Sequence, residues 1–322
     1  MTGRLLTALA RGIAVVFGVV TLTFFLLHLA PGDPVSRLLG PAATPEQIVA
    51  GRHTLGLDRP LATQYAAWLG QAVRGDFGNS IAQGRPAARI LGEAWPATAL
   101  LILLSIGLSW AAGIAIGTFQ ANTRRRGLDA AASALTTGLN AMPGYWLGLA
   151  LVMLFTYSLG WLPAFGAAGV DADFLGGWDR LVDRLRHLAL PLATLTLIGL
   201  GANARFTRAA MRELAFAPFL LSARARGLTG RRVALRHQLR SALVPIVTLL
   251  GLSLPAVFSG AVFVEAIFAW PGVGQVLVQA VQARDYPVVM AAAAISAALV
   301  VGGNLLAEAL AALADPRLRD AA

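Results

Sequence analysis

Long apolar stretches alternate with short charged segments along the chain. A helix needs about 20 residues to cross the hydrocarbon core of a bilayer. Six stretches without a charged residue approach or exceed that length, and they cover residues 12–32, 94–123, 130–170, 187–204, 241–264 and 286–307. Uncharged runs of this length are typical of membrane-spanning helices. The pattern predicts an all-α, polytopic membrane protein with six transmembrane helices.

The stretch 130–170 is too long for one membrane-spanning helix and too short for two. Within it, the segment LNAMPGYWLG predicts an interrupted helix at Asn140, Met142 and Pro143. Such interruptions are tolerated where the backbone faces protein or water rather than lipid. These three residues are therefore our candidates for the lining of a pore. The tail LGWLPAFGAAG, with a proline and three glycines, predicts a loop that leaves the membrane.

Composition and the sidedness of charge agree with a membrane protein. Hydrophobic residues make up 57% of the chain and charged residues only 13%. Segments 1–11, 120–131, 205–240 and 313–322 hold 16 arginines and 4 acidic residues, whereas the other connecting segments hold 10 and 11. The positive-inside rule then predicts that both termini are cytoplasmic. Because the net charge of +10 is explained in this way, no nucleic-acid partner is expected.

About 60 residues connect the first two predicted spans, and they are patterned rather than random. Thr44 is placed as an N-cap before Pro45, and PLATQYAAWLGQAV predicts a second short helix. Asp33 and Asp76 are expected to form turns, with contact to a soluble partner as the alternative. The predicted organisation is an N-terminal helix (1–32), a periplasmic helical subdomain (33–94), a five-helix core (95–314) and a cytoplasmic tail (315–322).

Several kinds of chemistry are missing from the sequence. There is no cysteine, and all 26 basic residues are arginine, so the chain has no P-loop lysine to hold nucleotide phosphates. The four histidines lie in different segments and form no metal-ligand spacing. We expect that the chain is not an enzyme and binds no metal or cofactor. If ATP drives it, separate subunits must hydrolyse that ATP.

The cytoplasmic segment 205–240 predicts two consecutive helices. The first covers 219–226 and is closed by Gly227, since glycine ends helices in the left-handed conformation. The second begins after Thr229. It is expected to place Leu235, Leu239 and Leu243 on one face and Arg232, Arg236 and Arg240 on another.

At this point the sequence resembles a known family. ARARGLTGRRVALRHQLRSALVPIVT is similar to the cytoplasmic coupling loop of bacterial ABC-importer permeases, specifically the first (B-type) permease of the dipeptide and oligopeptide subfamily. PGDP, LGLDRPLATQYAAWL, GDFGNS, GWLPAFG, EAIFAWPGVGQVLVQAVQARDYPVV and DPRLR resemble that subfamily in the same order. The resemblance implies a type I ABC permease fold. The family signature E-A-A-x-x-x-G aligns with Leu221, Ser222, Ala223 and Gly227, of which the first two depart from it.

The resemblance also implies a mechanism. The short helix would dock in a cleft of a separate ATPase subunit, with small Ala223 and Ala225 allowing close approach and Arg224 and Arg226 binding acidic groups. The alternative for these arginines is that they only follow the positive-inside rule. The residues implied to couple to the ATPase are Phe219, Leu221, Ser222, Ala223, Arg224, Ala225, Arg226 and Gly227.

The implied partners are a second homologous permease subunit, two ABC ATPase subunits, a periplasmic substrate-binding protein and the lipid bilayer of the bacterial inner membrane. The chain would form half of the translocation pathway. Its cargo stays open among dipeptides, oligopeptides, glutathione, nickel and related solutes.

Two other functions remain as alternatives at this stage. An ion-coupled secondary transporter usually has more spans, internal repeats and buried acids. An intramembrane enzyme would need a nucleophile or metal motif, and the chain shows neither HExxH nor cysteine. Glu308 directly follows the last uncharged stretch and is the one acid placed in a predicted span, close enough to its cytoplasmic end to reach that interface.

Overall fold

The computed structural model describes residues 2–314, with side chains except at 2–6, 306–314 and positions 244, 247, 248, 250–256, 258 and 259. This part of the chain is helical, and its one β interaction is an isolated bridge between Asn79 and Pro86. It divides into two compact units, residues up to 98 with 271–302, and residues 99–270 with those from 303 to 314. The predicted tail 315–322 lies outside the described residues.

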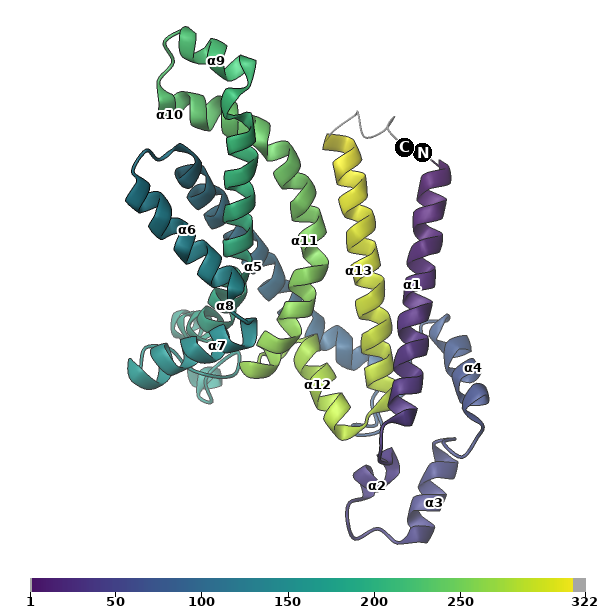
Figure 1. Cartoon of the computed structure of the whole chain (residues 1–322). Coiled ribbons are helices and arrows are strands. Elements are labelled where there is room, and N and C mark those ends of the chain that lie inside the picture. The colour runs from purple at the N-terminus through teal and green to yellow at the C-terminus, as the bar shows by residue number, and fades with distance from the viewer. Residues whose placement is uncertain (1, 315–322) are drawn as a thin grey trace. The chain divides into compact units, whose positions relative to one another are not determined.

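The first unit is built around the first and last long helices. It contains α1 (Thr2–Leu29), α2 (Pro34–Leu39), α3 (Pro45–Thr54), α4 (Leu61–Ala72), α12 (Val273–Ala283) and the first parts of α5 (Ala87–Asn122) and α13 (Tyr286–Ala314). α1 and α13 run antiparallel, side by side (Figure 1). Gly12 permits their close approach, because a Cβ atom there would lie 2.4 Å from Val301 Cγ1.

The connecting segment 33–86 folds by the local signals that the sequence displays. Asp33 caps α2 by accepting a hydrogen bond from the backbone N–H of Ser36 (3.0 Å). Thr44 caps α3 in a reciprocal capping box with Gln47. Asp76 Oδ1 accepts from the backbone N–H of Gly78 (2.9 Å), a turn of the predicted kind. The two predicted short helices and the turn at Asp76 are confirmed, whereas Asp33 caps a further short helix instead of forming a turn.

Asp285 joins this segment to the start of α13. Its side chain is buried and accepts hydrogen bonds from Ser80 Oγ and from the backbone N–H groups of Ile81 (3.0 Å) and Ala82 (3.3 Å). The preceding Arg284 adopts a left-handed conformation, with φ of 56°, and donates to the carbonyl oxygen of Pro31. Two adjacent charged residues thus hold two distant loops of the unit.

The second unit holds the remaining elements. They are the rest of α5, α6 (Arg126–Ala141), α7 (Gly144–Val152), the π-helical turn η1 (Met153–Ser158), η2 (Ala172–Phe174), α8 (Gly177–Glu213), η3 (Leu214–Phe216), α9 (Pro218–Ala225), α10 (Gly230–Arg232), the π-helical turn η4 (Val233–Gln238), α11 (Leu239–Ile267) and the end of α13. α8 is central, since α6, α7 and α11 all pack against it.

Glycines set the closest helix contacts in this unit. Gly113 and Gly117, four residues apart on α5, face α8, as in the small-xxx-small motifs of membrane helices. A Cβ atom on Gly117 would lie 2.5 Å from the carbonyl oxygen of Ala204. On another face of α8, a Cβ on Gly201 would lie 2.5 Å from the carbonyl oxygen of Thr136 in α6. Backbone therefore packs on backbone at both contacts.

Four or five of the six predicted membrane crossings are found among the described residues, with different boundaries. Four described helices are long and apolar enough to cross a bilayer, and α6 with the following helix 144–158 forms a fifth candidate that is bent by 105°. The sixth apolar stretch lies in α11, whose 29 residues exceed the necessary length. α5 begins at Ala87, inside the predicted subdomain 33–94, and α8 extends well beyond the predicted 187–204.

Candidate functional site

The segment 214–238 folds as a helical hairpin, which we call the cytoplasmic hairpin in keeping with its predicted location. It consists of η3, α9, α10 and η4, and α9 packs against η4. Leu220, Ala223 and Val233 are buried at its centre, with Leu214 and Leu228 packed against them. The hairpin therefore has a small apolar core of its own.

Gly227 ends α9 as the sequence predicts. Its φ is +77°. The backbone N–H of Gly227 donates to the carbonyl oxygen of Arg224 (2.9 Å), and that of Leu228 donates to the carbonyl oxygen of Ala223 (3.3 Å). This pair of bonds is the Schellman motif, and the burial of Leu228 on the hairpin core supplies the hydrophobic contact that accompanies it.

The exposed face of α9 combines apolar and basic side chains. Of the eight residues predicted to couple to an ATPase, seven are exposed: Phe219, Leu221, Ser222, Arg224, Ala225, Arg226 and Gly227. Ala223 is the exception, because it is only 1% exposed and lies in the hairpin core. The expectation that Ala223 offers close approach to a partner is therefore wrong. Its small size serves the packing of α9 on η4.

The second helix of the hairpin differs from the prediction. Thr229 lies at the N-cap position with extended backbone, but its side chain makes no capping hydrogen bond. The π-helical turn η4 changes the register, so the buried residues are Val233, Ala234 and Gln238, whereas Leu235 is 47% exposed. The predicted leucine face is wrong at Leu235, because it assumed a regular α-helical period.

Polar contacts fix the hairpin to α8 and α8 to α6. Gln238 Nε2 donates to the carbonyl oxygen of Met211 at the end of α8 (2.6 Å), and both residues are buried. Arg208 of α8 forms an ion pair with Asp129 of α6 (2.6 Å) and donates to Ser133 Oγ (2.8 Å). Sequence reasoning missed these residues, because nothing in their local pattern indicates their distant partners.

The predicted interruption is a sharp bend, since α6 and the following helix are bent by 105°. α6 ends at Ala141, Met142 and Pro143 have extended backbone, and α7 begins at Gly144. Asn140, Met142 and Pro143 are all exposed in the isolated chain. Their role as pore lining stays a prediction.

Four other polar or acidic residues lie in or beside the predicted spans. His28 contacts Gln64 (Nε2–Oε1 3.3 Å), and Asn203 donates to Ser109 Oγ (3.2 Å), so both make structural contacts. Glu265, predicted to lie just outside a span, is completely buried within α11. The side chain of Glu308 lies outside the described residues.

Long apolar helices, one of them bent, with a basic hairpin between two of them define a permease of the type I ABC fold. The chain belongs to the family described as binding-protein-dependent transport system inner membrane component. That family's model matches residues 113–320, and the model for the N-terminal part of these proteins matches residues 1–104. The family is one of transport permeases and not of enzymes. Its members work in the inner membrane with ATPase and further permease subunits.

Two relatives extend over nearly the whole chain. The oligopeptide transport system permease protein AppB of Bacillus subtilis (strain 168) is 36% identical, with 99% of each chain covered. The di/tripeptide transport system permease protein DppB of Pseudomonas aeruginosa (strain UCBPP-PA14) is 36% identical, with 94% of each covered. Among solved structures, the inward-facing MetNI methionine ABC transporter matches with a TM-score of 0.54 at 16% identity, over 70% of this chain and 96% of that one. The chain is thus an ABC transporter permease and not an ion-coupled secondary transporter.

Proposed function

We propose that this chain forms half of the translocation pathway of an importer for peptides or similar small solutes. The observation that carries the proposal is the likeness along the full chain to permeases named for oligopeptide and di/tripeptide transport. A second homologous permease supplies the other half of the pathway. A periplasmic binding protein delivers the cargo, and two ABC ATPase subunits hydrolyse the ATP, so this chain itself binds no nucleotide or other cofactor.

The exposed face of α9 is the proposed contact with one ATPase subunit. Arg224 and Arg226 would meet acidic groups, while Phe219 and Leu221 would enter an apolar cleft. Ser222 donates its hydroxyl to the carbonyl oxygen of Pro218 (3.0 Å), so this hydroxyl is already bonded within α9. This arrangement needs the hairpin and both termini on the cytoplasmic side, in agreement with the excess of arginine there.

Cysteine crosslinking tests the contact, since the chain has no native cysteine. In the assembled transporter, Ala225→Cys on the exposed face should crosslink to a cysteine introduced in the ATPase cleft. Ala223→Cys, two residues away and buried, is the matched control and should not. Equal crosslinking of both variants, or of neither, would count against docking through this face.

Uptake in liposomes tests the function. The complete transporter should accumulate a labelled dipeptide or oligopeptide when binding protein and ATP are supplied, and this chain alone should accumulate none. Unlabelled peptide should compete, whereas nickel and glutathione should not. Uptake by the isolated chain would overturn the dependence on partners, and competition only by nickel or glutathione would overturn the cargo class.

A further inference from the structure

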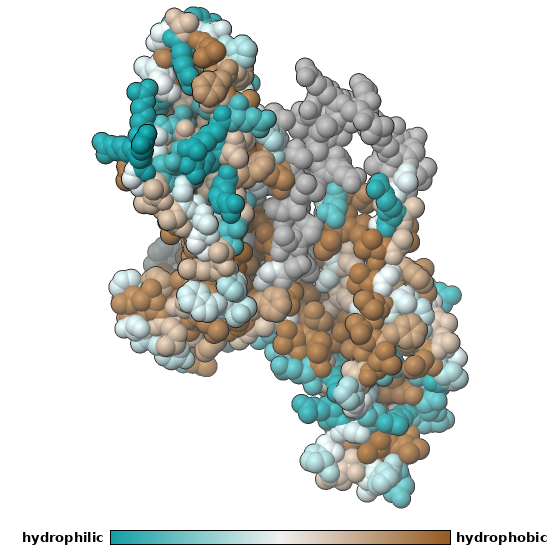
Figure 2. Space-filling view, viewed as in Figure 1, coloured by the Kyte–Doolittle hydropathy of each residue, from teal (hydrophilic) through white to brown (hydrophobic). Residues whose placement is uncertain are grey.

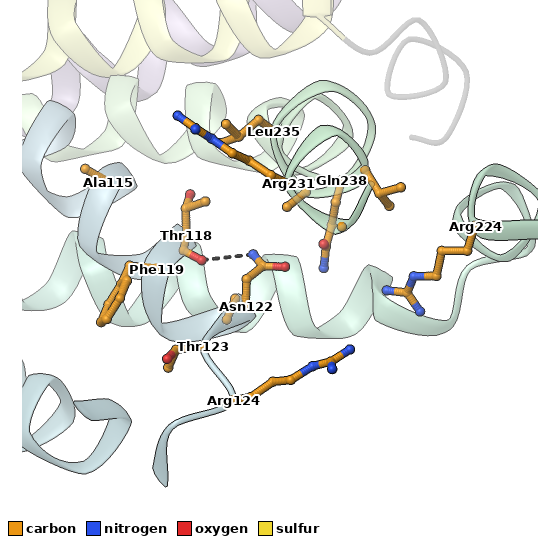
Figure 3. Close-up of a pocket in the computed structure, with 14 residues that line it drawn as sticks. Ala115, Thr118, Phe119, Asn122, Thr123, Arg124, Arg224, Arg231, Leu235 and Gln238 are labelled. Carbon is orange, nitrogen blue, oxygen red and sulfur yellow. Dashed lines mark hydrogen bonds between the residues drawn. The ribbon is translucent and has the colours of Figure 1, made fainter. Parts of the chain in front are cut away.

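A basic cavity lies between the end of α5 and the cytoplasmic hairpin (Figure 3). Its volume is about 860 Å³, within the range of ligand sites in proteins. α5 and the two residues that follow it contribute residues from Ala115 to Arg124, and the hairpin contributes Arg224 and residues from Gly230 to Gln238. All of these belong to the second compact unit.

Three arginines line this cavity, and no acidic residue does. They are Arg124, Arg224 and Arg231. None of the three forms an ion pair within the part of the chain that the structure describes, whereas the nearby Arg208 and Arg212 both pair with Asp129. In Figure 3 the side chains of Arg124 and Arg224 point toward one another from opposite sides of the cavity. Like charges in this arrangement repel, so an anionic group between them would stabilise the arrangement.

The same cavity has an apolar side. Phe119 of α5 is 48% exposed, and Leu235 of the hairpin is exposed to a similar extent. Ala115 continues this surface one turn further into the apolar part of α5. The lining therefore changes from apolar to basic toward the end of α5 and Arg124 beyond it. A lipid changes in the same way, from its acyl chains to its headgroup.

We propose that this cavity binds the headgroup of an anionic phospholipid. The phosphate would lie between the guanidinium groups of Arg124 and Arg224, where arginine forms short charge-assisted hydrogen bonds, and Arg231 would add positive charge to the same cavity. The first acyl carbons would lie on Phe119 and Leu235. With Arg224 occupied in this way, Arg226 and the apolar side chains of α9 would remain for the proposed contact with the ATPase. An acidic segment of a partner protein is the competing occupant, and the experiments below distinguish it from a lipid. The combination of both surfaces favours a lipid. Such a lipid would join the end of α5 to the hairpin that bears α9.

Native mass spectrometry of the full-length chain, purified in mild detergent and given phosphatidylglycerol or phosphatidylcholine, tests the proposal. Wild-type protein should keep phosphatidylglycerol in preference to phosphatidylcholine. The double variant Arg124→Gln/Arg231→Gln should bind phosphatidylglycerol about 30-fold more weakly, as expected for two arginines near an anionic surface. Arg124→Lys/Arg231→Lys, which keeps the charge, should retain most of the binding and controls for misfolding.

Two matched controls locate the site. Arg205→Gln/Arg236→Gln removes two exposed arginines from the same predicted side but outside the cavity, and it should bind as wild type does. A fluorophore on Phe119→Cys should be quenched by brominated phosphatidylglycerol more than one on Leu128→Cys, which is exposed outside the cavity. Equal binding of the two lipids, or unchanged binding by the Arg124→Gln/Arg231→Gln variant, would overturn the proposal. So would loss of ATPase association in that variant with lipid binding intact, which would assign the cavity to a protein contact.

Discussion

Gly227 lies where the cytoplasmic hairpin turns between its two helices. No atom outside its chain neighbours would come within 4 Å of an added Cβ, so space does not exclude a side chain there. The backbone conformation opposes a side chain instead, because a φ of +77° is strained for every residue with a Cβ. The glycine is required for its conformation rather than for its small size.

Gly227→Val should therefore insert and assemble but lose transport and the stimulation of ATP hydrolysis by the binding protein. The strain is on the order of 1–2 kcal/mol, which is small for the whole protein but enough to shift α9. Both activities can be measured in reconstituted complexes. Gly127→Val at the start of α6 is the control, since this residue lies outside the cavity, its backbone is not left-handed and its Cβ would meet nothing. Normal activity of Gly227→Val would show that the turn tolerates displacement.

Asp33 shows a second residue-scale effect, which depends on pH. Burial opposes its ionisation, but hydrogen bonds from Ser36 and Arg52 outweigh burial and hold the pKa of Asp33 below its usual value of 3.8. The ionised carboxylate is thus favoured by folding. The stability that the ionised Asp33 contributes to the folded state is fully present above pH 3.8, and it is lost as the pH falls through the lower pKa of the folded state.

Limited proteolysis between residues 33 and 54 should accordingly increase at acidic pH. Asp33→Ala should increase cleavage at neutral pH as well, since loss of an N-cap costs about 1 kcal/mol. Asp33→Asn keeps the cap but cannot ionise, and should show weaker dependence on pH than wild type over the same range. If Asn and Asp gave identical pH profiles, ionisation of Asp33 would have no part in the stability of this segment.

At the scale of elements, α8 is positioned by backbone contacts that only glycine allows. Gly117 of α5 meets Ala204 and Thr207 of α8, and Gly201 of α8 meets Thr136 of α6. Without a strong hydrophobic effect between helices in lipid, such close van der Waals contact is a main source of stability. The ion pair of Arg208 with Asp129 adds a polar contact at the end of the same α6–α8 pair.

Gly117→Ala should destabilise the protein by about 1–3 kcal/mol, because its Cβ would lie 2.5 Å from a backbone oxygen that no rotamer change can move. Gly107→Ala on the same helix should be neutral or stabilising, since its Cβ meets nothing and alanine is the better helix former. The thermal unfolding midpoints of the two variants, measured in the same detergent, test this difference. A Gly117→Ala protein at least as stable as wild type would rule out the close α5–α8 contact.

At the scale of the whole molecule, the predicted topology has six crossings with both termini on one side. The antiparallel pairing of α1 and α13 within the first unit agrees with this, since Gly12 near the start of one helix meets Val301 toward the end of the other. Figure 2 shows hydrophilic side chains gathered on the hairpin helices α9 and α10. The sidedness itself rests on the distribution of arginine.

A cysteine at Pro60 should react with a membrane-impermeant maleimide only from the periplasmic side, and one at Ala225 only from the cytoplasmic side. Both positions are exposed, and the chain has no native cysteine to interfere. Labelling of intact cells measures access from the periplasmic side, and labelling of inverted vesicles measures access from the cytoplasmic side. Labelling of Pro60→Cys only from the cytoplasmic side would reverse the topology.

Much of the fold can be predicted from the sequence, because the signals that determine these elements are local. Uncharged length predicts the membrane helices, Thr44 and Pro45 predict the start of α3, and Gly227 predicts the end of α9. Each depends on the bilayer thickness or on backbone sterics within a few residues. The resemblance to peptide permeases likewise rests on contiguous motifs, and it identified the family and the hairpin.

Only the tertiary structure decided which residues meet across the chain. It placed Ala223 inside the hairpin, shifted the buried face from Leu235 to Gln238, and paired Arg208 with Asp129. It also brought Arg124, just after the end of α5, to the same cavity as Arg224 and Arg231. Hydropathy and charge counts describe each segment alone, whereas helix register, a π-helical turn and contacts between distant segments depend on how the elements pack.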